Sequence, residues 1–218
     1  MTRVLIIDDC SKDNTAELWS ELKNEFTSFP LEYYRHPENR GLTGGINTAF
    51  EKYLADMQTS KPALAYGLMD GDNSHSPFFL PEMVKKICEG YDVVIASRFR
   101  AGARIEGVVW WRQILSFGLT CLFKIIRNVP GVRDYSCGYR LYSPAIVEKV
   151  KKRFPNDVVF EKSFASMVEI LLRCDMEGAL CSEVPFLLRY DLKLGESKMP
   201  FKKTILGNLK LLQTLRKY

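Results

Sequence analysis

The sequence has no apolar run that is long enough to cross a membrane. Its longest apolar stretch, from Ile114 to Phe123, is interrupted by Ser116 and Thr120. A spanning helix needs about 20 predominantly apolar residues, so we expect no transmembrane helix. The run at 4–7 is too short for the core of a signal peptide. We therefore expect a cytoplasmic protein that contacts a membrane only from its surface or through a partner.

The sequence also lacks cysteine pairs with the spacing of a zinc or redox site. The six cysteines lie at positions 10, 88, 121, 137, 174 and 181, without a C-x-x-C pair. We expect them to be reduced thiols. No G-x-G-x-x-G motif follows the first apolar run, which disfavours a dinucleotide-dependent oxidoreductase.

The sequence also lacks a large excess of charge of one sign. The 31 lysines and arginines exceed the 26 acidic residues by only +5. This mild charge does not indicate nucleic-acid binding, and it is compatible with an anionic ligand or a membrane surface. With 218 residues and 46% hydrophobic content, the chain is expected to form one domain with a sizeable core and at most a small appendage.

What the chain does contain is a series of apolar runs separated by helical patterns. We expect strands at 4–7, 31–35, 63–69, 91–96 and 179–188, a loop that enters a strand within 132–142, and helices at 16–26, 46–57, 77–89, 108–126 and 160–174. Strands without polar alternation, separated by helices, indicate a parallel sheet that is covered on both faces. Pro185 within the last run favours a sheet edge.

Two carboxylates follow the strand predicted at 63–69. Asp70 and Asp72 flank a glycine, and Asn73, Ser74 and His75 come directly after them. At the carboxyl end of a strand, this pair could share a hard cation such as Mg²⁺ or Mn²⁺, which completes its shell with water and substrate phosphate. The alternative is an ordinary turn, because all of these residue types are common in turns.

Polar groups also follow the first two predicted strands. Asp8 and Asp9 come after the run at 4–7. The loop at 36–45 is rich in Gly, Asn and Arg and leads into the helix predicted at 46–57, so its backbone N–H groups and Arg40 could approach a phosphate. An ordinary glycine-rich connector explains this loop equally well.

The second half of the chain changes character. The helix predicted at 108–126 is apolar on most sides, and it carries Trp110, Trp111 and Arg112, with Ser116 on the same face as Arg112. Such a helix lies either in the core, which is the more frequent case, or in a membrane interface. Residues 200–218 combine basic residues with an apolar stripe, which fits a basic amphipathic helix on an anionic membrane or packed on its own domain.

Six segments of the chain together form a recognisable series. They are VLIIDDCSKDNT, RHPENRGLTGGINTAF, LMDGDNSHSP, VVIASRF, VRDYSCGYRLY and RYDLKLGESKM. In this order they resemble the motifs of family 2 glycosyltransferases with the GT-A fold, and most closely those of the dolichol-phosphate (polyprenyl-phosphate) mannosyltransferase type. The resemblance implies an α/β GT-A domain over 1–199, with a nucleotide-sugar-binding half at 1–100 and an acceptor half at 101–199, followed by the helix at 200–218.

The resemblance also implies roles for individual residues. Those implied to bind the sugar donor are Asp8, Asp9, Arg40, Gly41, Asp70 and Arg98, and those implied to hold Mn²⁺ or Mg²⁺ are Asp70, Asp72 and Ser74. Those implied to handle the acceptor or its phosphate are Arg112, Ser116, Ser197 and Lys198. The residues implied to be catalytic are Asp72, Arg112, Asp134 and Arg140.

The sequence departs from the family at its beginning. Family members start with a strand that carries a Pro-Thr-Tyr-Asn-Glu type motif, whereas this sequence starts at what corresponds to the second strand. Without that central strand, its two neighbours lose their pairing and leave backbone groups unsatisfied. We therefore expect an N-terminally truncated GT-A fold, from an incomplete sequence in preference to a protein that has lost donor affinity.

The residues also suggest the chemistry. A metal ion and arginines would stabilise the charge on a departing nucleoside diphosphate. A polyprenyl phosphate is ionised at neutral pH, since its second pKa is about 6, and it needs no strong general base. A sugar hydroxyl would need one, and Asp134 is then the candidate. The resemblance implies single displacement with inversion.

These observations leave three hypotheses. The first is a metal-dependent transfer of mannose or glucose from a nucleotide sugar, of the GDP-mannose or UDP-glucose type, to a polyprenyl or dolichyl phosphate. It would occur at the cytoplasmic face of a membrane that the protein contacts peripherally. The second is transfer to a sugar hydroxyl in polysaccharide or glycolipid synthesis. The third is a non-catalytic fragment or scaffold protein derived from such an enzyme.

Overall fold

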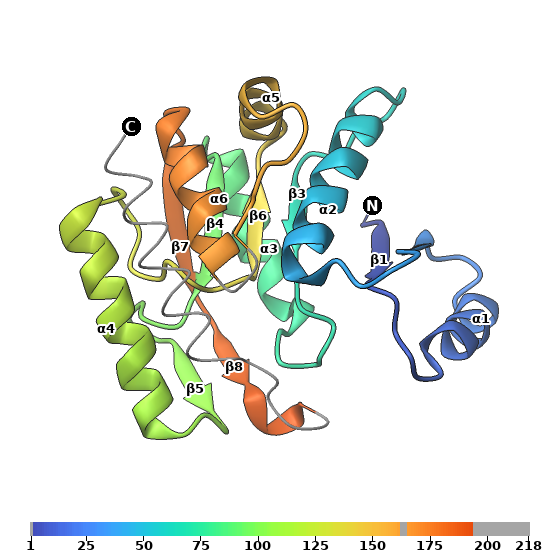
Figure 1. Ribbon diagram of the computed structural model, residues 1–218, viewed down its shortest axis with the longest axis horizontal. Helices are drawn as coiled ribbons and strands as arrows, with labels where there is room; N and C mark the ends of the chain where they lie inside the picture. The colour runs from blue at the N-terminus through green and yellow to red at the C-terminus, as the bar shows by residue number, and fades with distance from the viewer. Residues whose placement is uncertain (1, 162–164, 194–218) are drawn as a thin grey trace.

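The computed structural model describes residues 2–161 and 165–193 and has an α/β architecture (Figure 1). The strands are β1 Val4–Asp8, β2 Leu31–Arg35, β3 Tyr66–Leu68, β4 Val93–Ser97, β5 Arg104–Glu106, β6 Arg140–Tyr142, β7 Cys181–Pro185 and β8 Leu187–Arg189. The α-helices are α1 Thr15–Glu25, α2 Gly41–Met57, α3 Leu80–Cys88, α4 Trp110–Ile126, α5 Pro144–Arg153 and α6 Ala165–Met176. Short 3₁₀ helices are η1 Pro77–Phe79 and η2 Tyr190–Leu192.

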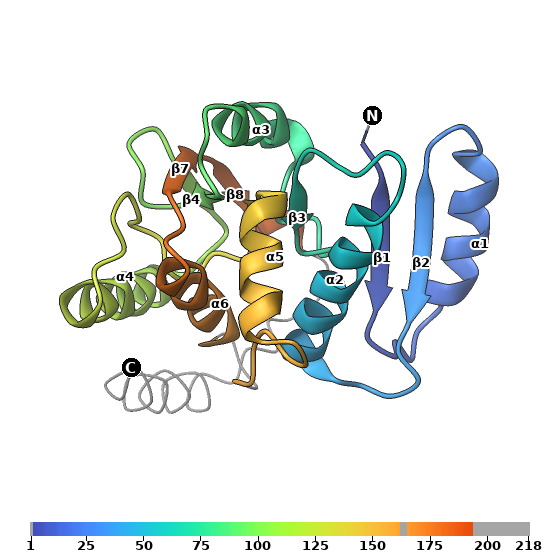
Figure 2. The ribbon, with the colours of Figure 1, turned by 90° about the horizontal axis from the view of Figure 1, so that it is seen from above.

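The central sheet has four strands in the order β3-β6-β4-β7. Every residue of β4 is buried, so this strand lies in the middle of the core. Figure 2 shows α3 on one face of the sheet and α2, α5 and α6 on the other. The predicted helices on both faces are therefore confirmed.

The central sheet is mostly parallel, as predicted, with one antiparallel strand. β4 and β7 are parallel, but β6 enters between β3 and β4 and runs antiparallel to both. The pairs β1-β2 and β5-β8 are parallel, as expected. β7 has only β4 as its neighbour, which confirms the edge position that Pro185 indicated.

Two elements, α5 and β5, have no counterpart in the prediction. The sequence does carry a signal for α5, because Pro144 stands in its first turn and the Ser143 hydroxyl accepts a hydrogen bond from Ile146 N at 3.2 Å. β5 is a short strand that pairs with β8. A strand that depends on a partner more than 80 residues away leaves no local pattern.

Helix α2 begins at Gly41, before the predicted start at position 46. The cause is a remote cap, since the Asp9 carboxylate accepts hydrogen bonds from Arg40 N at 2.8 Å and Gly41 N at 2.7 Å. A carboxylate satisfies and attracts the exposed N–H groups of a helix N-terminus. Gly44 is needed in this first turn, because a Cβ there would lie 2.2 Å from the Arg40 Cβ.

The N-terminal strands form a sheet of their own. β1 pairs only with β2, and no strand ladder joins it to β3 within the described residues. Helix α2 nevertheless contacts both β1 and β3, and Figure 2 shows β1 between β2 and β3. Within the described residues, α2 therefore connects the two sheets.

The split sheet predicts uneven local stability. None of the α1 residues is buried, and β1 and β2 have few partners outside their own pair. We expect amide protons of β1 and β2 to exchange through local openings well below the ~5–15 kcal/mol of global unfolding, and those of β4 to exchange only near that limit. Native-state hydrogen exchange measures both. Equal protection of β1 and β4 would show that the two sheets unfold as one unit.

Candidate functional site

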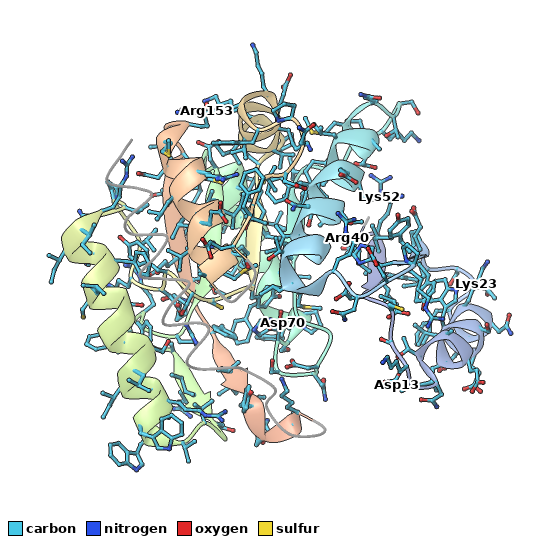
Figure 3. The ribbon with its side chains drawn as sticks, in the orientation of Figure 1. Asp13, Lys23, Arg40, Lys52, Asp70 and Arg153 are labelled. Carbon is cyan, nitrogen blue, oxygen red and sulfur yellow. The ribbon has the colours of Figure 1, made fainter. Side chains whose placement is uncertain are left out.

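The Asp-x-Asp loop follows β3, as the sequence predicted. The side chain of Asp70 is 45% exposed, and Figure 3 shows it well away from Arg153. The side chain of Asp72 is 26% exposed. The two carboxylates therefore remain accessible from solvent, to different degrees.

Asp72 is engaged by its own chain on both oxygens. Its Oδ1 accepts hydrogen bonds from the Ser74 hydroxyl at 2.5 Å and the Ser74 N–H at 3.1 Å, and its Oδ2 lies 2.7 Å from Lys193 Nζ. Burial by itself would raise the pKa of Asp72, but the bonds from Lys193 and Ser74 hold it below its ordinary value. Asp72 is thus a charged carboxylate at neutral pH. No motif in the sequence predicts the ion pair between Lys193 and Asp72.

His75 supports the Asp-x-Asp loop from its buried side. Its ring is buried and stacks on Tyr139 with 5.2 Å between centroids. Its Nδ1 accepts a hydrogen bond from Asp70 N at 3.1 Å. Burial lowers the pKa of His75 against the opposing pull of Asp70, so the ring is neutral. In this position His75 fixes the backbone of Asp70.

Two distant segments pack against the same loop. The Tyr139 hydroxyl donates to the Ser76 carbonyl at 3.0 Å, and Arg189 N donates to the Ser74 carbonyl at 3.2 Å. A Cβ on Gly138 would lie 3.5 Å from Asp70 Oδ1. The tertiary structure therefore joins the S-x-G-Y-R segment and the end of β8 to the Asp-x-Asp loop.

The chemistry of this loop fits a hard divalent ion. Mg²⁺ and similar ions are often held by one or two carboxylates, with phosphate and water completing the shell. Asp70 and Asp72 supply such carboxylates, and the Ser74 hydroxyl is bonded to Asp72. No group of three His, Cys, Asp or Glu side chains that could hold a metal occurs in residues 2–161 and 165–193. A bound ion would therefore take its remaining ligands from water or from a substrate.

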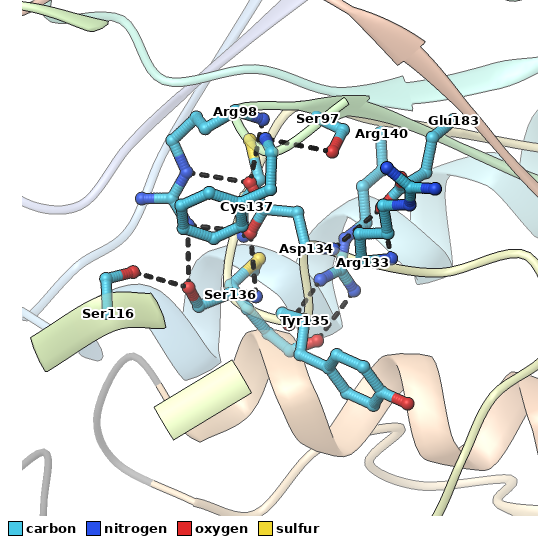
Figure 4. A network of polar contacts seen from close by, with 12 residues as sticks. Ser97, Arg98, Ser116, Arg133, Asp134, Tyr135, Ser136, Cys137, Arg140 and Glu183 are labelled. Atoms are coloured by element: carbon cyan, nitrogen blue, oxygen red, sulfur yellow. Dashed lines mark hydrogen bonds and ion pairs between the residues drawn. The ribbon is translucent and has the colours of Figure 1, made fainter. Parts of the chain in front are cut away.

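A buried ion pair lies at the end of β4. The guanidinium of Arg98 donates to both oxygens of Asp134 at 2.7 Å, and its Nη2 also donates to the Ser136 hydroxyl at 2.7 Å (Figure 4). Asp134 is fully buried and accepts further backbone bonds from Arg98 N and Cys137 N. Ser136 continues the network to Ser116 on α4, with 3.4 Å between the hydroxyl oxygens.

This geometry does not favour Asp134 as a general base. Burial alone would raise its pKa, but the charge of Arg98 and the hydrogen bonds to it hold the pKa of Asp134 below its ordinary value. A base must reach the proton that it removes, and both oxygens of Asp134 face the chain itself. Asp134 instead orients Arg98.

Arg140 is likewise fully buried and does not face the site. Its guanidinium donates to the carbonyls of Met167 at 2.6 Å and Tyr135 at 2.7 Å. Arg140 therefore fastens the 134–140 loop to α6. A supporting role fits this position better than the catalytic role that the resemblance implies.

Glu183 on β7 is a supporting residue that the sequence reading missed. Its Oε1 accepts hydrogen bonds from Arg133 N at 2.6 Å and Asp134 N at 2.7 Å. Burial raises the pKa of Glu183 against the lowering effect of these two bonds. One sequence signal was available, because a glutamate inside an otherwise apolar strand needs a buried partner.

Arg98, Arg112 and Ser116 line one pocket, although β4 and α4 supply them separately. The other residues of its wall are Phe99, Ile105, Val108, Gln113 and Leu188. The predicted phosphate-handling residues of the described part of the chain are thus brought together. Ser197, Lys198 and the helix predicted at 200–218 lie outside the described residues.

Helix α4 is amphipathic. It does not lie wholly in the core, although the core is the more frequent position for a helix of this composition. Thr120 and Phe123 are buried on its inner side. Several large apolar side chains on the other side are exposed, among them Trp110 at 71%, Ile114 at 60% and Ile125 at 83%. The described residues contain no helix with the length and hydropathy of a membrane span.

Asp8 and Asp9 are both engaged within the chain. Asp8 is buried and accepts hydrogen bonds from the Tyr33 hydroxyl at 2.5 Å and Ser11 N at 2.8 Å. Asp9 caps α2 and lies 2.7 Å from His36 Nδ1. In this structure the two carboxylates build the loop that carries Arg40 and Gly41. Their predicted contact with a donor stays a prediction.

The raised pKa of Glu183 has a measurable consequence. The folded state holds this proton more tightly than the unfolded state, so the stabilisation is complete below the ordinary glutamate pKa of about 4.3 and is lost as pH rises through the folded value. Relative to Glu183→Gln, which keeps the acceptor for both N–H groups, the wild type should lose stability from pH 4 to 7, by on the order of 1 kcal/mol.

Urea unfolding of both proteins at each pH measures this difference. The exposed Glu51→Gln variant controls for the loss of one surface charge. A wild-type minus Glu183→Gln difference that is flat or rises with pH would contradict the assignment.

The chain is similar in sequence to several known proteins. The family model described as "Glycosyl transferase family 2" matches residues 2–151. A dolichol-phosphate mannosyltransferase from Pyrococcus furiosus is 26% identical over 216 residues, which are 99% of this chain and 55% of that protein. A polyprenol monophosphomannose synthase from Mycolicibacterium smegmatis is 28% identical over 198 residues, or 90% of this chain and 69% of that protein.

Solved structures show the same fold. Glucosyl-3-phosphoglycerate synthase from Mycobacterium tuberculosis, in complex with Mn²⁺, uridine diphosphate and glucosyl-3-phosphoglycerate, has a TM-score of 0.58 at 15% identity, over 98% of this chain and 67% of that chain. The fold is thus GT-A, as predicted. The chain spans only about half of the Pyrococcus relative, 55% of its length. Because the family model matches more than half of the chain, the chain belongs to glycosyltransferase family 2.

Proposed function

We propose that this protein transfers a hexose from a nucleotide sugar to the phosphate of a polyprenyl lipid, with the aid of Mn²⁺ or Mg²⁺. The observation that carries the proposal is the pocket lined by Arg98, Arg112 and Ser116. It presents two guanidinium groups and a hydroxyl beside a helix whose other side exposes apolar side chains. A phosphate on an apolar tail has this combination of properties.

On the donor side, the proposal places the sugar diphosphate at the Asp-x-Asp loop. Asp70 and Asp72 would hold the divalent ion, which would neutralise charge on the departing diphosphate. The carboxylates themselves repel a diphosphate, so this loop is suited to that ligand only with a cation present. Arg40 is exposed at the start of α2 and is available for the nucleotide.

On the acceptor side, Arg98 and Arg112 would bind the lipid phosphate and Ser116 would donate a hydrogen bond to it. Arg98 is held in place by Asp134, and Ser136 connects it to Ser116. An ionised phosphate oxygen can attack the anomeric carbon without losing a proton to a base. The burial of Asp134 supports this acceptor over a sugar hydroxyl, which would need that base.

Helix α4 supports a peripheral contact with the membrane. Its exposed side carries Trp110, Ile114 and Ile125, and the sequence from Gly107 to Arg133 contains no acidic residue. Helices that lie in a membrane interface combine an apolar side with basic residues and tryptophan. We propose the cytoplasmic face of a membrane as the place of this contact.

The names of the relatives agree with these substrates. The two curated relatives are named for transfer of mannose to dolichol phosphate or polyprenol, and the structural relative was solved with Mn²⁺ and UDP. Mannose is therefore the first sugar to test and glucose the second. The nearly complete use of Asp8 and Asp9 within the chain is the observation that keeps a non-catalytic scaffold as a second candidate.

A transfer assay distinguishes these candidates. The folded chain is incubated with Mn²⁺, labelled GDP-mannose or UDP-glucose, and either a polyprenyl phosphate or an oligosaccharide. Label in the lipid phosphate supports the proposal, and label in the oligosaccharide supports the hydroxyl acceptor. No transfer to either acceptor by a folded chain would favour the scaffold.

The Asp-x-Asp loop gives a specific test of donor binding. Asp70→Asn removes one charge from the exposed carboxylate while keeping the side-chain shape. We expect Mn²⁺-dependent donor binding to weaken on the order of 100-fold, because the ion that would bridge to the diphosphate loses a charged carboxylate ligand. Calorimetry measures it, with Asp157→Asn, in the segment between α5 and α6, as the matched control. Equal affinities in the two variants would exclude Asp70 from the donor site.

The exposed side of α4 gives a test of membrane binding. Ile114→Ser with Ile125→Ser removes two exposed apolar side chains, each worth about 1.5–3 kcal/mol when buried. We expect partitioning onto anionic vesicles to fall at least about tenfold. Vesicle co-sedimentation measures it, with Leu64→Ser, which is 61% exposed between α2 and β3, as the control. Unchanged partitioning of the double variant would place the membrane contact elsewhere.

A further inference from the structure

Lys193 occupies the Asp-x-Asp loop in the structure. Its Nζ lies 2.7 Å from Asp72 Oδ2, and the ammonium lies 5.1 Å from the centre of the Tyr190 ring. The Lys193 side chain is only 22% exposed and that of Asp72 only 26%. The pair is therefore a partly shielded contact and not one of the fully solvated surface ion pairs that contribute little.

The contact makes the two aspartates unequal. Asp72 has an ammonium on one oxygen and the Ser74 hydroxyl on the other. Within the described residues, Asp70 has no lysine or arginine within ion-pair distance, and its only such neighbour is His75 at 4.0 Å. Asp70 is thus accessible to a cation, whereas Oδ2 of Asp72 is already paired with the ammonium of Lys193.

An ammonium and a divalent ion compete for that oxygen. Two cations bound to one oxygen would lie only about 4 Å apart, where their charges repel strongly at the effective dielectric near a protein surface. A divalent ion doubles this repulsion. An ion that uses both aspartates must therefore displace Lys193 from Asp72 Oδ2.

The segment that carries Lys193 is fixed just before it. Arg189 pairs with Asp191 at 2.7 Å and with Glu106 at 3.1 Å, and its backbone N–H donates to the Ser74 carbonyl. These contacts hold the start of the segment against the Asp-x-Asp loop without involving the Lys193 side chain. Lys193 can then leave Asp72 by side-chain rotation while its backbone stays near the loop.

We infer that Lys193 is a built-in competitor of the divalent ion: it neutralises Asp72 when no ion is bound, and ion binding requires its release. The inference rests on the proposed function, because it concerns the same ion site. It adds that ion binding is coupled to a change at Lys193. The released ammonium would remain within a side-chain length of the place where the donor's phosphates are proposed to lie.

The first test compares Mn²⁺ binding by the full chain without donor, measured by electron paramagnetic resonance of free Mn²⁺. Lys193→Met removes the ammonium and keeps the apolar stem. Lys149→Met is the matched control, since Lys149 is exposed on α5 and lines the same surface hollow as Arg153, which lies well away from Asp70 (Figure 3). We expect Lys193→Met to bind Mn²⁺ at least about fivefold more tightly than wild type, the lower end of typical coupling between sites, and Lys149→Met to match wild type.

The outcomes separate this inference from the proposed function. Equal Mn²⁺ affinity of wild type and Lys193→Met, or weaker binding by the variant, would overturn the inference and leave the ion site intact. Absence of Mn²⁺ binding in all three proteins would overturn both. Donor binding that needs Lys193 and is indifferent to Mn²⁺ would show that the lysine replaces the ion, which also overturns the inference.

A second measurement uses the unaltered protein, so it does not depend on the folding of a variant. Lysine acetylation is followed at Lys193 by mass spectrometry with and without Mn²⁺. We expect Mn²⁺ to raise the rate at Lys193 several-fold, since a free amine reacts faster than a shielded ion pair, and to leave Lys149 unchanged. An unchanged or lower rate at Lys193 would show that the ion does not displace it.

Discussion

The ion pair of Arg98 and Asp134 is the contact on which the rest of the site depends. Asp134 is fully buried, and a buried carboxylate is stable only with a charged partner and hydrogen bonds to its oxygens. Arg98 supplies two bonds from its side chain and one from its backbone, and Cys137 N supplies another. The pair thereby ties the end of β4 to the loop before β6. It also orients the guanidinium that lines the pocket on α4.

Around this pair, the polar residues of the site fall into two groups. His75, Glu183 and Arg140 are buried and bonded to backbone atoms of loops, so they set the shape of the site. Asp70 is exposed, and Arg112 and Ser116 are partly exposed, so these are the residues that the proposal assigns to substrates. A resemblance of motifs does not separate these groups, because loop-building and substrate-binding residues are equally characteristic of a family.

Charge is distributed so that the two proposed ligands have different places. The Asp-x-Asp loop is anionic and can take a diphosphate only together with cations, one of which is Lys193 in this structure. The pocket lined by Arg98 and Arg112 carries the positive charge that the proposed lipid phosphate needs. Helix α4 connects the second place to an apolar surface, since its buried side faces the core while Trp110 and Ile125 are exposed. The separation suits a reaction between a soluble donor and a lipid acceptor.

The sequence by itself determined the α/β class, most strands and helices, and the positions of the Asp-x-Asp and acceptor motifs, because apolar periodicity and turn residues are local signals. Only the tertiary structure decided that β6 is antiparallel and that Asp9 starts α2 at Gly41. It also decided that Asp134 forms an ion pair with Arg98, and that Lys193 pairs with Asp72. Each of these depends on residues far apart in the chain, and contacts of that kind are set by packing and charge in three dimensions, which no local pattern encodes.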